Sequence, residues 1–175
     1  IDALNWCGIT IDEGVSVGGK HEPYRQSERK EIYRSYALQL VESGKAYYAF
    51  DTAEQLEQQR QTAEQKKETF SYGSATRMKL NNSLALTIKE VNERLSNNVP
   101  YVIRLKVPEN ETITFTDLIR GEVSFDSNLV DDKVLLKSDG MPTYHLAHIV
   151  DDYLMEITHA IRGEEWLPSA PAHIL

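Results

Sequence analysis

The chain has 175 residues, 41% of them hydrophobic, and a formal net charge of −8 at pH 7. This length can bury a core in one or two domains, while the acidic balance excludes a surface that coats nucleic acid broadly, because phosphate binding needs clustered Lys and Arg. No stretch approaches the roughly 20 apolar residues of a membrane span, so no membrane partner is expected. The single cysteine, Cys7, excludes an internal disulfide and a cysteine zinc site.

The chain starts without Met and stops at His173-Ile-Leu, where a helix is predicted to begin. We therefore expect it to be an internal piece of a longer protein. Its charge is unevenly distributed, since residues 61–100 contain six basic against four acidic residues and are the only net basic stretch. Two interpretations remain open for this stretch: a solvated helical face or a patch that contacts phosphates.

The first predicted elements are a strand and an amphipathic helix. Residues 8–11, Gly-Ile-Thr-Ile, have the apolar and β-branched character of a short strand. Ser27 is predicted to cap a helix in which apolar residues recur at helical spacing as far as Val41. Gly44 is suited to end this helix.

Two further helices are predicted by their N-terminal signals. Thr52 with Gln55, and Thr87 with Glu90, have the spacing of a capping box. The first opens a polar helix that extends to about residue 67. Between the two helices, residues 69–83 are rich in Ser, Gly, Thr and Asn and predict a loop.

After residue 100 the hydrophobic period changes to two, which predicts a strand over residues 101–107. Residues 108–111, Pro-Glu-Asn-Glu, are suited to turn the chain so that residues 113–115 pair with this strand in the antiparallel sense. A further strand is expected at residues 123–125, after Gly121.

The last forty residues predict a strand–helix–strand unit. Residues 134–137 form the first strand, Thr143 can cap a helix that runs to about Leu154, and residues 157–161 form the second strand. A right-handed crossover makes such strands parallel, and ligands bind beyond their carboxyl ends. The predicted fold class is therefore an α/β domain interrupted by an α+β insertion.

Three polar side chains are expected to converge on one crevice of this unit. Tyr144 and His148 share one face near the start of the helix, and Arg162 follows the second strand. The planar guanidinium of Arg162 suits a ligand carboxylate, which it can hold through two hydrogen bonds. The alternative is that Tyr144 and His148 are satisfied core residues and that Arg162 pairs with Asp151 or Asp152.

The loop that follows, Arg162-Gly-Glu-Glu-Trp166, offers a stacking surface. Trp166 is placed to stack on a ligand ring, and Gly163 permits close backbone approach, although packing in a core is equally consistent for Trp166. The chain has no glycine-rich phosphate loop. Three other histidines towards the C-terminus show no pair with a recognised metal-ligand spacing: His145, His159 and His173.

A long run near the C-terminus resembles bacterial glutamyl-tRNA synthetases: Val134-Leu-Leu-Lys-Ser-Asp-Gly-Met-Pro-Thr-Tyr-His-Leu-Ala, then Val150-Asp-Asp and Ile157-Thr-His-Ala-Ile-Arg-Gly-Glu-Glu-Trp-Leu-Pro-Ser. Further matches to the family are Tyr24-Arg-Gln-Ser-Glu-Arg29, Gly44-Lys-Ala-Tyr47, Ile103-Arg-Leu-Lys-Val-Pro108 and Asp117-Leu-Ile-Arg-Gly-Glu-Val123. The resemblance covers nearly the whole chain and is weakest over residues 52–99.

The resemblance implies a class I synthetase, in which a Rossmann-like dinucleotide-fold catalytic domain is interrupted by an acceptor-binding insertion, the connective peptide. Residues 1–48 and 134–175 are then the two catalytic parts, and residues 49–133 are the insertion. The implied enzyme is a glutamate–tRNA ligase of the cytoplasm. It condenses glutamate with ATP and Mg²⁺ to glutamyl-adenylate and transfers the glutamyl group to the 3′ end of tRNA(Glu).

The resemblance also implies roles for particular residues. Tyr144, His148 and Arg162 fall where the family lines its glutamate pocket, with Arg162 facing the side-chain carboxylate. Glu165 and Trp166 fall where the family meets ATP. These residues are expected to orient substrates rather than attack them, so no catalytic residue is assigned in this chain.

Contacts to the tRNA acceptor stem are expected from basic residues of the insertion: Arg77, Lys79, Arg104, Lys106 and Arg120. Ion pairing within the sheet is the alternative for Arg104, Lys106 and Arg120. Some relatives hold zinc with cysteines where this chain has Ala49 and Asp51, so no structural zinc is expected.

The nucleotide-handling motifs of the family, of the His-Ile-Gly-His and Lys-Met-Ser-Lys-Ser types, are not in this sequence. The chain alone is therefore expected to form no adenylate. Three other functions remain open: a glutaminyl-tRNA synthetase, a paralogue that glutamylates a modified tRNA base, and a non-catalytic RNA-binding module. The sequence also leaves open whether tRNA(Gln) is charged.

Overall fold

The computed structural model describes residues 2–175, in which helices alternate with short strands. The elements, with 3-10 helices marked η, are α1 (Asp2–Trp6), η1 (Gln26–Glu28), α2 (Lys30–Glu42), β1 (Ala46–Ala49), α3 (Ala53–Gln65), η2 (Arg77–Lys79), α4 (Ile88–Ser96), β2 (Val102–Leu105), β3 (Thr112–Asp117), β4 (Gly121–Asp126), η3 (Ser127–Leu129), β5 (Val134–Leu136), α5 (Tyr144–Leu154), η4 (Glu164–Ser169) and α6 (Ala170–Ile174). None of these helices is both long and apolar enough to cross a membrane.

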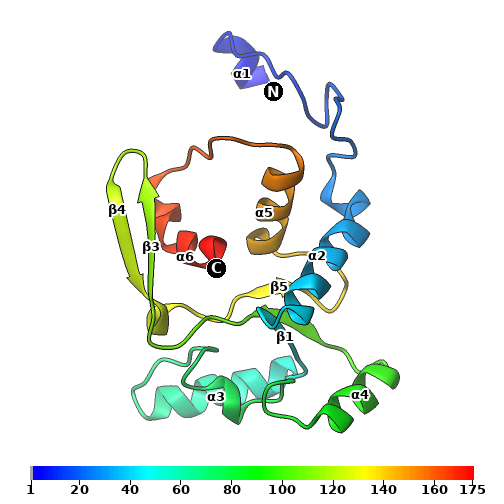
Figure 1. Ribbon diagram of the computed structural model, residues 1–175, viewed down its shortest axis with the longest axis vertical. Coiled ribbons are helices and arrows are strands. Elements are labelled where there is room, and N and C mark those ends of the chain that lie inside the picture. Colours follow the sequence, from blue (N-terminus) through cyan, green and yellow to red (C-terminus); the bar gives the residue numbers. More distant parts are fainter. Residues whose placement is uncertain (1) are drawn as a thin grey trace.

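A three-stranded antiparallel sheet in the order β1-β2-β5 joins segments that lie far apart in the sequence (Figure 1). In its register, Ala46 lies opposite Leu105 and Tyr47 lies opposite Arg104. Because side chains alternate along a strand, Ala46 and Leu105 point to one face of the sheet and Tyr47 and Arg104 to the other. The sheet therefore has two faces with different neighbours.

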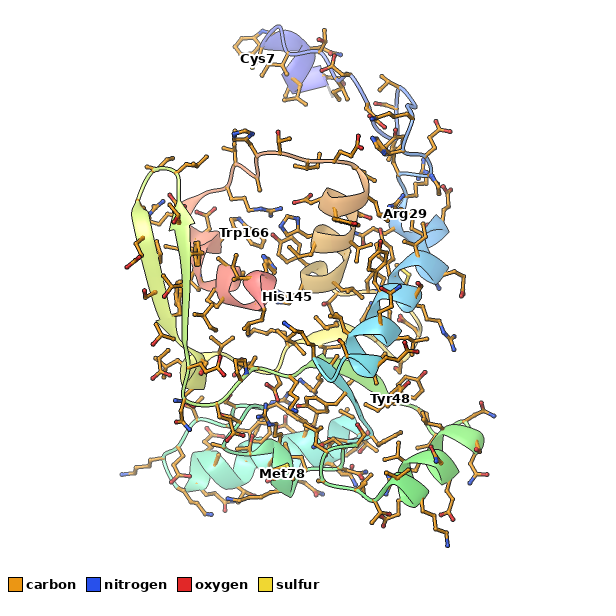
Figure 2. The ribbon with its side chains drawn as sticks, in the orientation of Figure 1. Cys7, Arg29, Tyr48, Met78, His145 and Trp166 are labelled. Atoms are coloured by element: carbon orange, nitrogen blue, oxygen red, sulfur yellow. The ribbon has the colours of Figure 1, made fainter. Side chains whose placement is uncertain are left out.

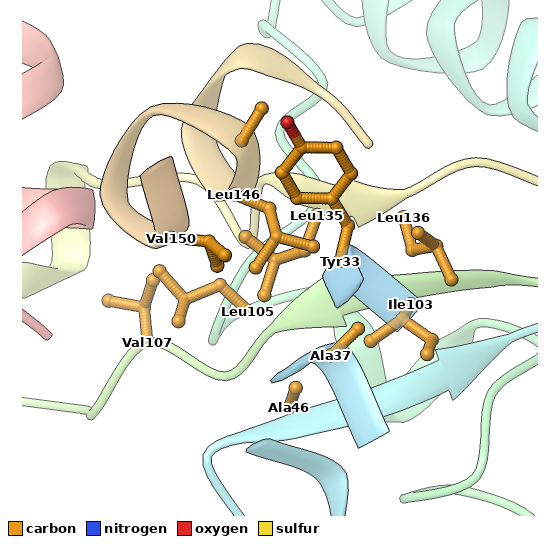
Figure 3. Packing of buried hydrophobic residues seen from close by; sticks show 11 residues of the cluster. Tyr33, Ala37, Ala46, Ile103, Leu105, Val107, Leu135, Leu136, Leu146 and Val150 are labelled. Atoms are coloured by element: carbon orange, nitrogen blue, oxygen red, sulfur yellow. The ribbon is translucent and has the colours of Figure 1, made fainter. Parts of the chain in front are cut away.

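The first face is covered by α2 and α5, which lie side by side (Figure 1). Figure 3 shows the cluster that they bury against the sheet. Fully burying one large aliphatic side chain is worth about 1.5–3 kcal/mol, so this cluster fixes both helices to the sheet. Its buried members are Tyr33, Ala37, Ala46, Ile103, Leu105, Val107, Leu135, Leu136, Leu146, Ala147 and Val150.

The opposite face carries a smaller core. Tyr47, Ala49, Tyr72 and Leu80 are buried there, with partly buried apolar side chains of α3 and of the following loop packed around them. Figure 1 places α3 and α4 on this side of the sheet, away from α2 and α5. The two cores share the strands of one sheet, so the elements on both faces depend on the same strand pairing.

An ion pair ties α2 to α5. Arg29, at the start of α2, is only 3% exposed, and its Nε lies 2.9 Å from Asp151 Oδ1. The hydroxyl of Tyr33 donates to Asp151 Oδ2 at 2.8 Å. Together with its burial, this carboxylate raises the pKa of Tyr33 to about 12. The Asp151 carboxylate is thus fully engaged in holding the two helices together.

Both predicted capping boxes are confirmed. The backbone N–H of Gln55 donates to Thr52 Oγ1, and the Gln55 side chain accepts from the Thr52 backbone N–H. The same reciprocal pair joins Thr87 and Glu90 at the start of α4. Each cap satisfies backbone donors that the first helical turn leaves without partners.

The boundaries of α2 differ slightly from the prediction. Gly44 follows the helix with a φ of 74°, and the N–H of Lys45 donates to Leu40 O at 2.8 Å, as in a glycine-terminated helix. Ser27 does not cap the helix: it lies in η1, and α2 begins at Lys30 after Arg29. Arg29 occupies the N-cap position without a side-chain hydrogen bond to the helix, since its side chain contacts Asp151 instead.

The predicted pairing of residues 101–107 with residues 113–115 is wrong. β2 pairs with β1 and β5, and β3 pairs instead with β4 in a separate two-stranded hairpin around Gly121. A strand pairs where its apolar face can be buried, and Ile103 and Leu105 fit the core under α2 and α5. The strand expected at residues 123–125 is present as part of β4.

Two other predicted strands are also not formed. Residues 8–11 and 157–161 have no strand neighbour within residues 2–175, and Ile9 and Ile161 are largely exposed. β-Propensity alone does not hold a strand, because the ladder hydrogen bonds need a partner. The parallel strand–helix–strand unit is therefore not present in this part of the chain, and β5 pairs with β2 in the antiparallel sense.

Candidate functional site

The structure brings Tyr144, His148 and Arg162 together at the N-terminal half of α5. The Arg162 guanidinium donates through Nη1 to the Tyr144 hydroxyl. Its Nη2 lies 3.2 Å from His148 Nε2 and 2.9 Å from Nδ1. The Tyr144 and His148 rings stack with their centroids 5.3 Å apart and an angle of 9° between their planes. The predicted convergence of these three side chains is present in the structure.

Asp152 orients His148 from the next turn of the same helix. Its Oδ2 lies 3.0 Å from His148 Nδ1. Asp152 and Arg162 thus both contact the Nδ1 side of the ring, and these contacts fix the orientation of the imidazole. Burial lowers the pKa of His148, while the Asp152 carboxylate acts to raise it. The i, i+4 spacing of these two residues was a sequence signal for this contact that the prediction did not use.

The alternative in which Arg162 pairs with Asp151 or Asp152 is not what the structure shows. Asp151 binds Arg29 and Tyr33, and Asp152 binds His148. Arg162 is exposed and forms no ion pair among residues 2–175. The Arg162 guanidinium is held in place by the Tyr144 hydroxyl and the His148 ring, neither of which is an anion, so its positive charge is available to an external anion.

The side chain of Trp166 closes one side of this cluster. Its ring centroid lies 5.1 Å from that of Tyr144 and 6.0 Å from the Arg162 guanidinium carbon. Figure 2 shows Trp166 and His145 pointing into the space between α5 and the C-terminal helices. Trp166 remains 43% exposed, so the core-packing alternative does not hold for it. Glu165 lies beside it in η4 and is exposed.

A second histidine contact lies behind the cluster. His145 Nδ1 lies 3.2 Å from His173 Nε2, which joins α5 to α6. Burial lowers the pKa of His145, and burial together with the neighbouring His148 lowers that of His173 to about 4. Sequence reasoning missed this pair, because 28 residues separate its members. Within residues 2–175 no group of three or more metal-ligating side chains is clustered.

This geometry suits recognition of a carboxylate beside an aromatic surface. An oriented guanidinium, a hydroxyl and a neutral imidazole present hydrogen-bonding groups without a competing internal carboxylate on the guanidinium. The Trp166 indole adds a flat, half-open surface next to them. The arrangement contains no nucleophile–base pair, so it is suited to positioning a ligand.

A family model described as the catalytic domain of class I tRNA synthetases (E and Q) matches residues 1–175. The chain belongs to this family. The glutamate–tRNA ligase of Cytophaga hutchinsonii is 61% identical over 99% of this chain and 34% of its own length. That of Christiangramia forsetii is 58% identical over 100% of this chain and 35% of its own length.

Solved structures of such synthetases have the same fold. The crystal structure of a glutamate tRNA ligase from Elizabethkingia meningosepticum in complex with its amino acid matches with a TM-score of 0.95 and 50% identity, over 99% of this chain and 34% of that one. The glutamate-tRNA synthetase of Elizabethkingia anophelis matches with the same TM-score and identity, over 99% and 35%. The chain spans about a third of the length of these relatives.

The basic residues that were predicted from the sequence to contact tRNA divide into two groups. Arg77 is 4% exposed, with Nη1 3.3 Å from Asp132 Oδ2 and Nη2 2.7 Å from Glu109. The Arg104 guanidinium stacks 3.8 Å from the Tyr72 ring centroid, and its Nη1 donates to Asp132 O at 2.9 Å. Both guanidinium groups stabilise the smaller core.

The other three basic residues are exposed. Lys79 follows Arg77 in η2, and Lys106 follows β2. Arg120, at the turn of the β3–β4 hairpin, lies 3.4 Å from Glu164. This exposed pair contributes about 0–1 kcal/mol, so it leaves the Arg120 side chain free to exchange partners. Lys79, Lys106 and Arg120 are therefore more accessible to an external phosphate than the buried Arg77 and the partly buried Arg104.

Proposed function

We propose that the chain is part of a glutamate–tRNA ligase that activates glutamate with ATP and transfers it to the 3′ end of tRNA(Glu). The family model and the printed names of the relatives support this assignment. The observation that carries it is the Arg162 guanidinium, which Tyr144 and His148 hold beside the Trp166 ring.

Glutamate is proposed to bind through its side-chain carboxylate to Arg162. The guanidinium has no carboxylate partner in the described chain, so the ligand supplies the missing negative charge. The Tyr144 hydroxyl and the His148 imidazole fix the guanidinium plane in advance. Such preorganisation reduces the entropic cost of binding.

Glu165 and Trp166 are proposed to meet ATP, since both are exposed on η4 next to the glutamate site. Trp166 offers a ring face for stacking, and Glu165 an acceptor for hydroxyl or amino donors. Mg²⁺ enters as part of the nucleotide substrate. Residues 2–175 contain no cluster of three metal-ligating groups, and no residue of this chain is assigned to the ion.

The domain division is proposed to follow residues 1–48, 49–133 and 134–175, with the first and last ranges contributing to a Rossmann-like catalytic domain and the middle range forming the connective peptide. β1, β2 and β5 come from these different ranges and share one sheet. The sheet would therefore couple the insertion to α5, which carries the glutamate site. Because tRNA charging serves translation, we place the enzyme in the cytoplasm.

The acceptor stem of tRNA(Glu) is proposed to contact Lys79, Lys106 and Arg120. These side chains are exposed, whereas Arg77 and Arg104 are held by internal contacts. We therefore assign Arg77 and Arg104 to supporting this surface. Phosphate contacts made by exposed lysines confer affinity without sequence specificity.

The test is a chimera in which residues 1–175 replace the matching third of the Cytophaga hutchinsonii ligase. We expect glutamate-dependent ATP–pyrophosphate exchange in the chimera, and none in the chain alone because the nucleotide-handling motifs are missing from its sequence. Arg162→Gln in the chimera should raise the KM for glutamate at least tenfold, because a guanidinium–carboxylate pair is lost.

The matched control in this experiment is Arg34→Gln, which removes one positive charge from α2, outside the site. This variant should leave the KM for glutamate unchanged. Exchange that depends on glutamine instead of glutamate, or a chimera whose KM does not respond to Arg162→Gln, would sink the proposal.

A further inference from the structure

A cavity of about 210 Å³ lies on the face of the sheet opposite the glutamate site. This volume is several times the roughly 30 Å³ that one water molecule occupies in the liquid. Its walls come from α3, the loop before η2, β2 and the segment that leads into β5. Three of its lining residues are cationic: Arg60, Arg104 and Lys133. Arg60 lies 3.2 Å from Glu57 and Lys133 lies 2.9 Å from Asp131, so of these three only Arg104 has no acidic partner in the described chain.

Arg104 is the central cation of this cavity, and its hydrogen-bonding capacity is only partly used. Nη1 donates to the backbone oxygen of Asp132 at 2.9 Å, and the guanidinium lies on the Tyr72 ring. Its Nε is buried and has no hydrogen-bond partner within residues 2–175. An unsatisfied buried donor is costly, and it adds to the cost of holding this guanidinium away from water.

The acidic residues that line the cavity do not supply an anionic partner for this guanidinium. Both oxygens of Asp132 are engaged, by Tyr47 at 2.6 Å, by the Val107 N–H at 3.0 Å and by Arg77. Asp131 binds Lys133 at 2.9 Å and accepts from Ser71. Arg104 therefore forms no ion pair in the described chain, and its burial lowers the pKa of the guanidinium.

We propose that this cavity is a binding site for a small oxyanion of the phosphate type, held chiefly by the Arg104 guanidinium, with Arg60 at the rim and Lys133 on the wall. An oxyanion supplies several acceptor oxygens and a compensating negative charge in one group, which water does not. The partly buried Phe70 and Leu56 close the remaining wall. The oxyanion can be a free phosphate or a phosphate of bound RNA, and the proposal does not depend on the proposed synthetase activity.

Isothermal titration of the protein with inorganic phosphate, at constant ionic strength set with chloride, tests this site. We expect saturable binding with a Kd of about 1 mM or below. Arg34→Gln should leave it unchanged, because Arg34 is an exposed residue of α2 outside both sites. Binding that is absent, or that disappears in Arg34→Gln, would overturn the proposal.

Two variants locate the ion within the cavity. Arg104→Gln should abolish binding, with circular dichroism reporting whether the fold is kept. Arg60→Glu changes an exposed residue of α3 and should weaken binding about tenfold without loss of structure, since it reverses a charge at the rim. The matched control is Lys89→Glu on α4, which should change nothing. Equal affinity in Arg60→Glu and Lys89→Glu would also overturn the proposal.

The source of the oxyanion is decided by competition. If an RNA hairpin with the acceptor-stem sequence of tRNA(Glu) displaces phosphate in wild type and does so less well in Arg60→Glu, the natural ligand is an RNA phosphate. If the hairpin leaves phosphate binding unchanged, the site takes a free phosphate compound.

Discussion

The Arg77 guanidinium faces the fully buried Asp132 carboxylate, with Nη1 3.3 Å from Oδ2. The same Nη1 donates to Val107 O at 2.8 Å, so one side chain joins η2 to the ends of β2 and β5. Burial raises the pKa of Asp132 and outweighs the contacts with Tyr47 and Arg77, which both act to lower it. The pair is therefore part of the internal framework.

Replacing Arg77 with Ala should destabilise the protein by about 3–5 kcal/mol, because it leaves a buried carboxylate without its cation. Urea unfolding followed by circular dichroism measures this loss. The neighbouring Lys79→Ala, on the exposed side of η2, should stay within about 0.5 kcal/mol of wild type. Similar losses for the two variants would mean that Arg77 does not have the internal role seen here.

Stability should decline as the pH falls from 6.5 towards 4. The pKa of His173 is lowered from its ordinary value of 6.5 to about 4, so His173 is neutral in the folded state while the unfolded chain binds a proton. Its contribution is thus present above the unfolded pKa and lost through this window, with a slope of up to about 1.4 kcal/mol per pH unit and per proton.

His173→Gln should flatten the pH dependence between these values, as measured by urea unfolding at a series of pH values. The exposed His159 is the control, because His159→Gln should leave the slope as it is in wild type. A wild-type stability that stays constant from pH 6.5 to pH 4 would rule out a neutral, partly buried His173.

Asp152→Asn should disturb the glutamate site without removing a group that is proposed to touch the ligand. The Asp152 carboxylate acts to raise the pKa of His148, so its loss should lower that pKa further. An NMR titration of the His148 ring measures the shift, and we expect weaker glutamate binding in parallel. Asp139→Asn, in the exposed turn before α5, is the matched control, and an equal response in both variants would contradict the role of Asp152.

Lys79→Gln combined with Lys106→Gln should weaken binding of an acceptor-stem hairpin. The logarithm of affinity falls with the logarithm of salt concentration, with a slope of about −0.9 for each phosphate contact. The double variant should therefore make this slope shallower by about 2. Lys20→Gln combined with Lys89→Gln removes the same charge elsewhere and should have little effect. An unchanged slope in the first double variant would contradict the assigned tRNA surface.

Local signals in the sequence were sufficient for the two capped helices and for the shared face of Tyr144 and His148 on α5, whereas Arg162 reaches this face without the strand that was predicted to carry it. The capping boxes at Thr52 and Thr87 depend on residues three apart, and Tyr144 and His148 are one helical turn apart. Such contacts are decided by backbone geometry that every helix shares, so spacing alone predicts them. The family resemblance rested on runs of residues, and the family model confirmed it.

Strand pairing and the state of the arginines were decided only by the tertiary structure. Which strand meets β2 depends on which distant segment can cover Ile103 and Leu105, and spacing along the chain does not contain that information. The same holds for Arg77 and Arg104, which the sequence predicted to be exposed cations. Arg77 contacts the Asp132 carboxylate and the Val107 carbonyl, and Arg104 contacts the Tyr72 ring; all of these partners are tens of residues away. Residue type determined that these side chains are cationic. The packing of the smaller core determined that their guanidinium groups contact partners within the protein.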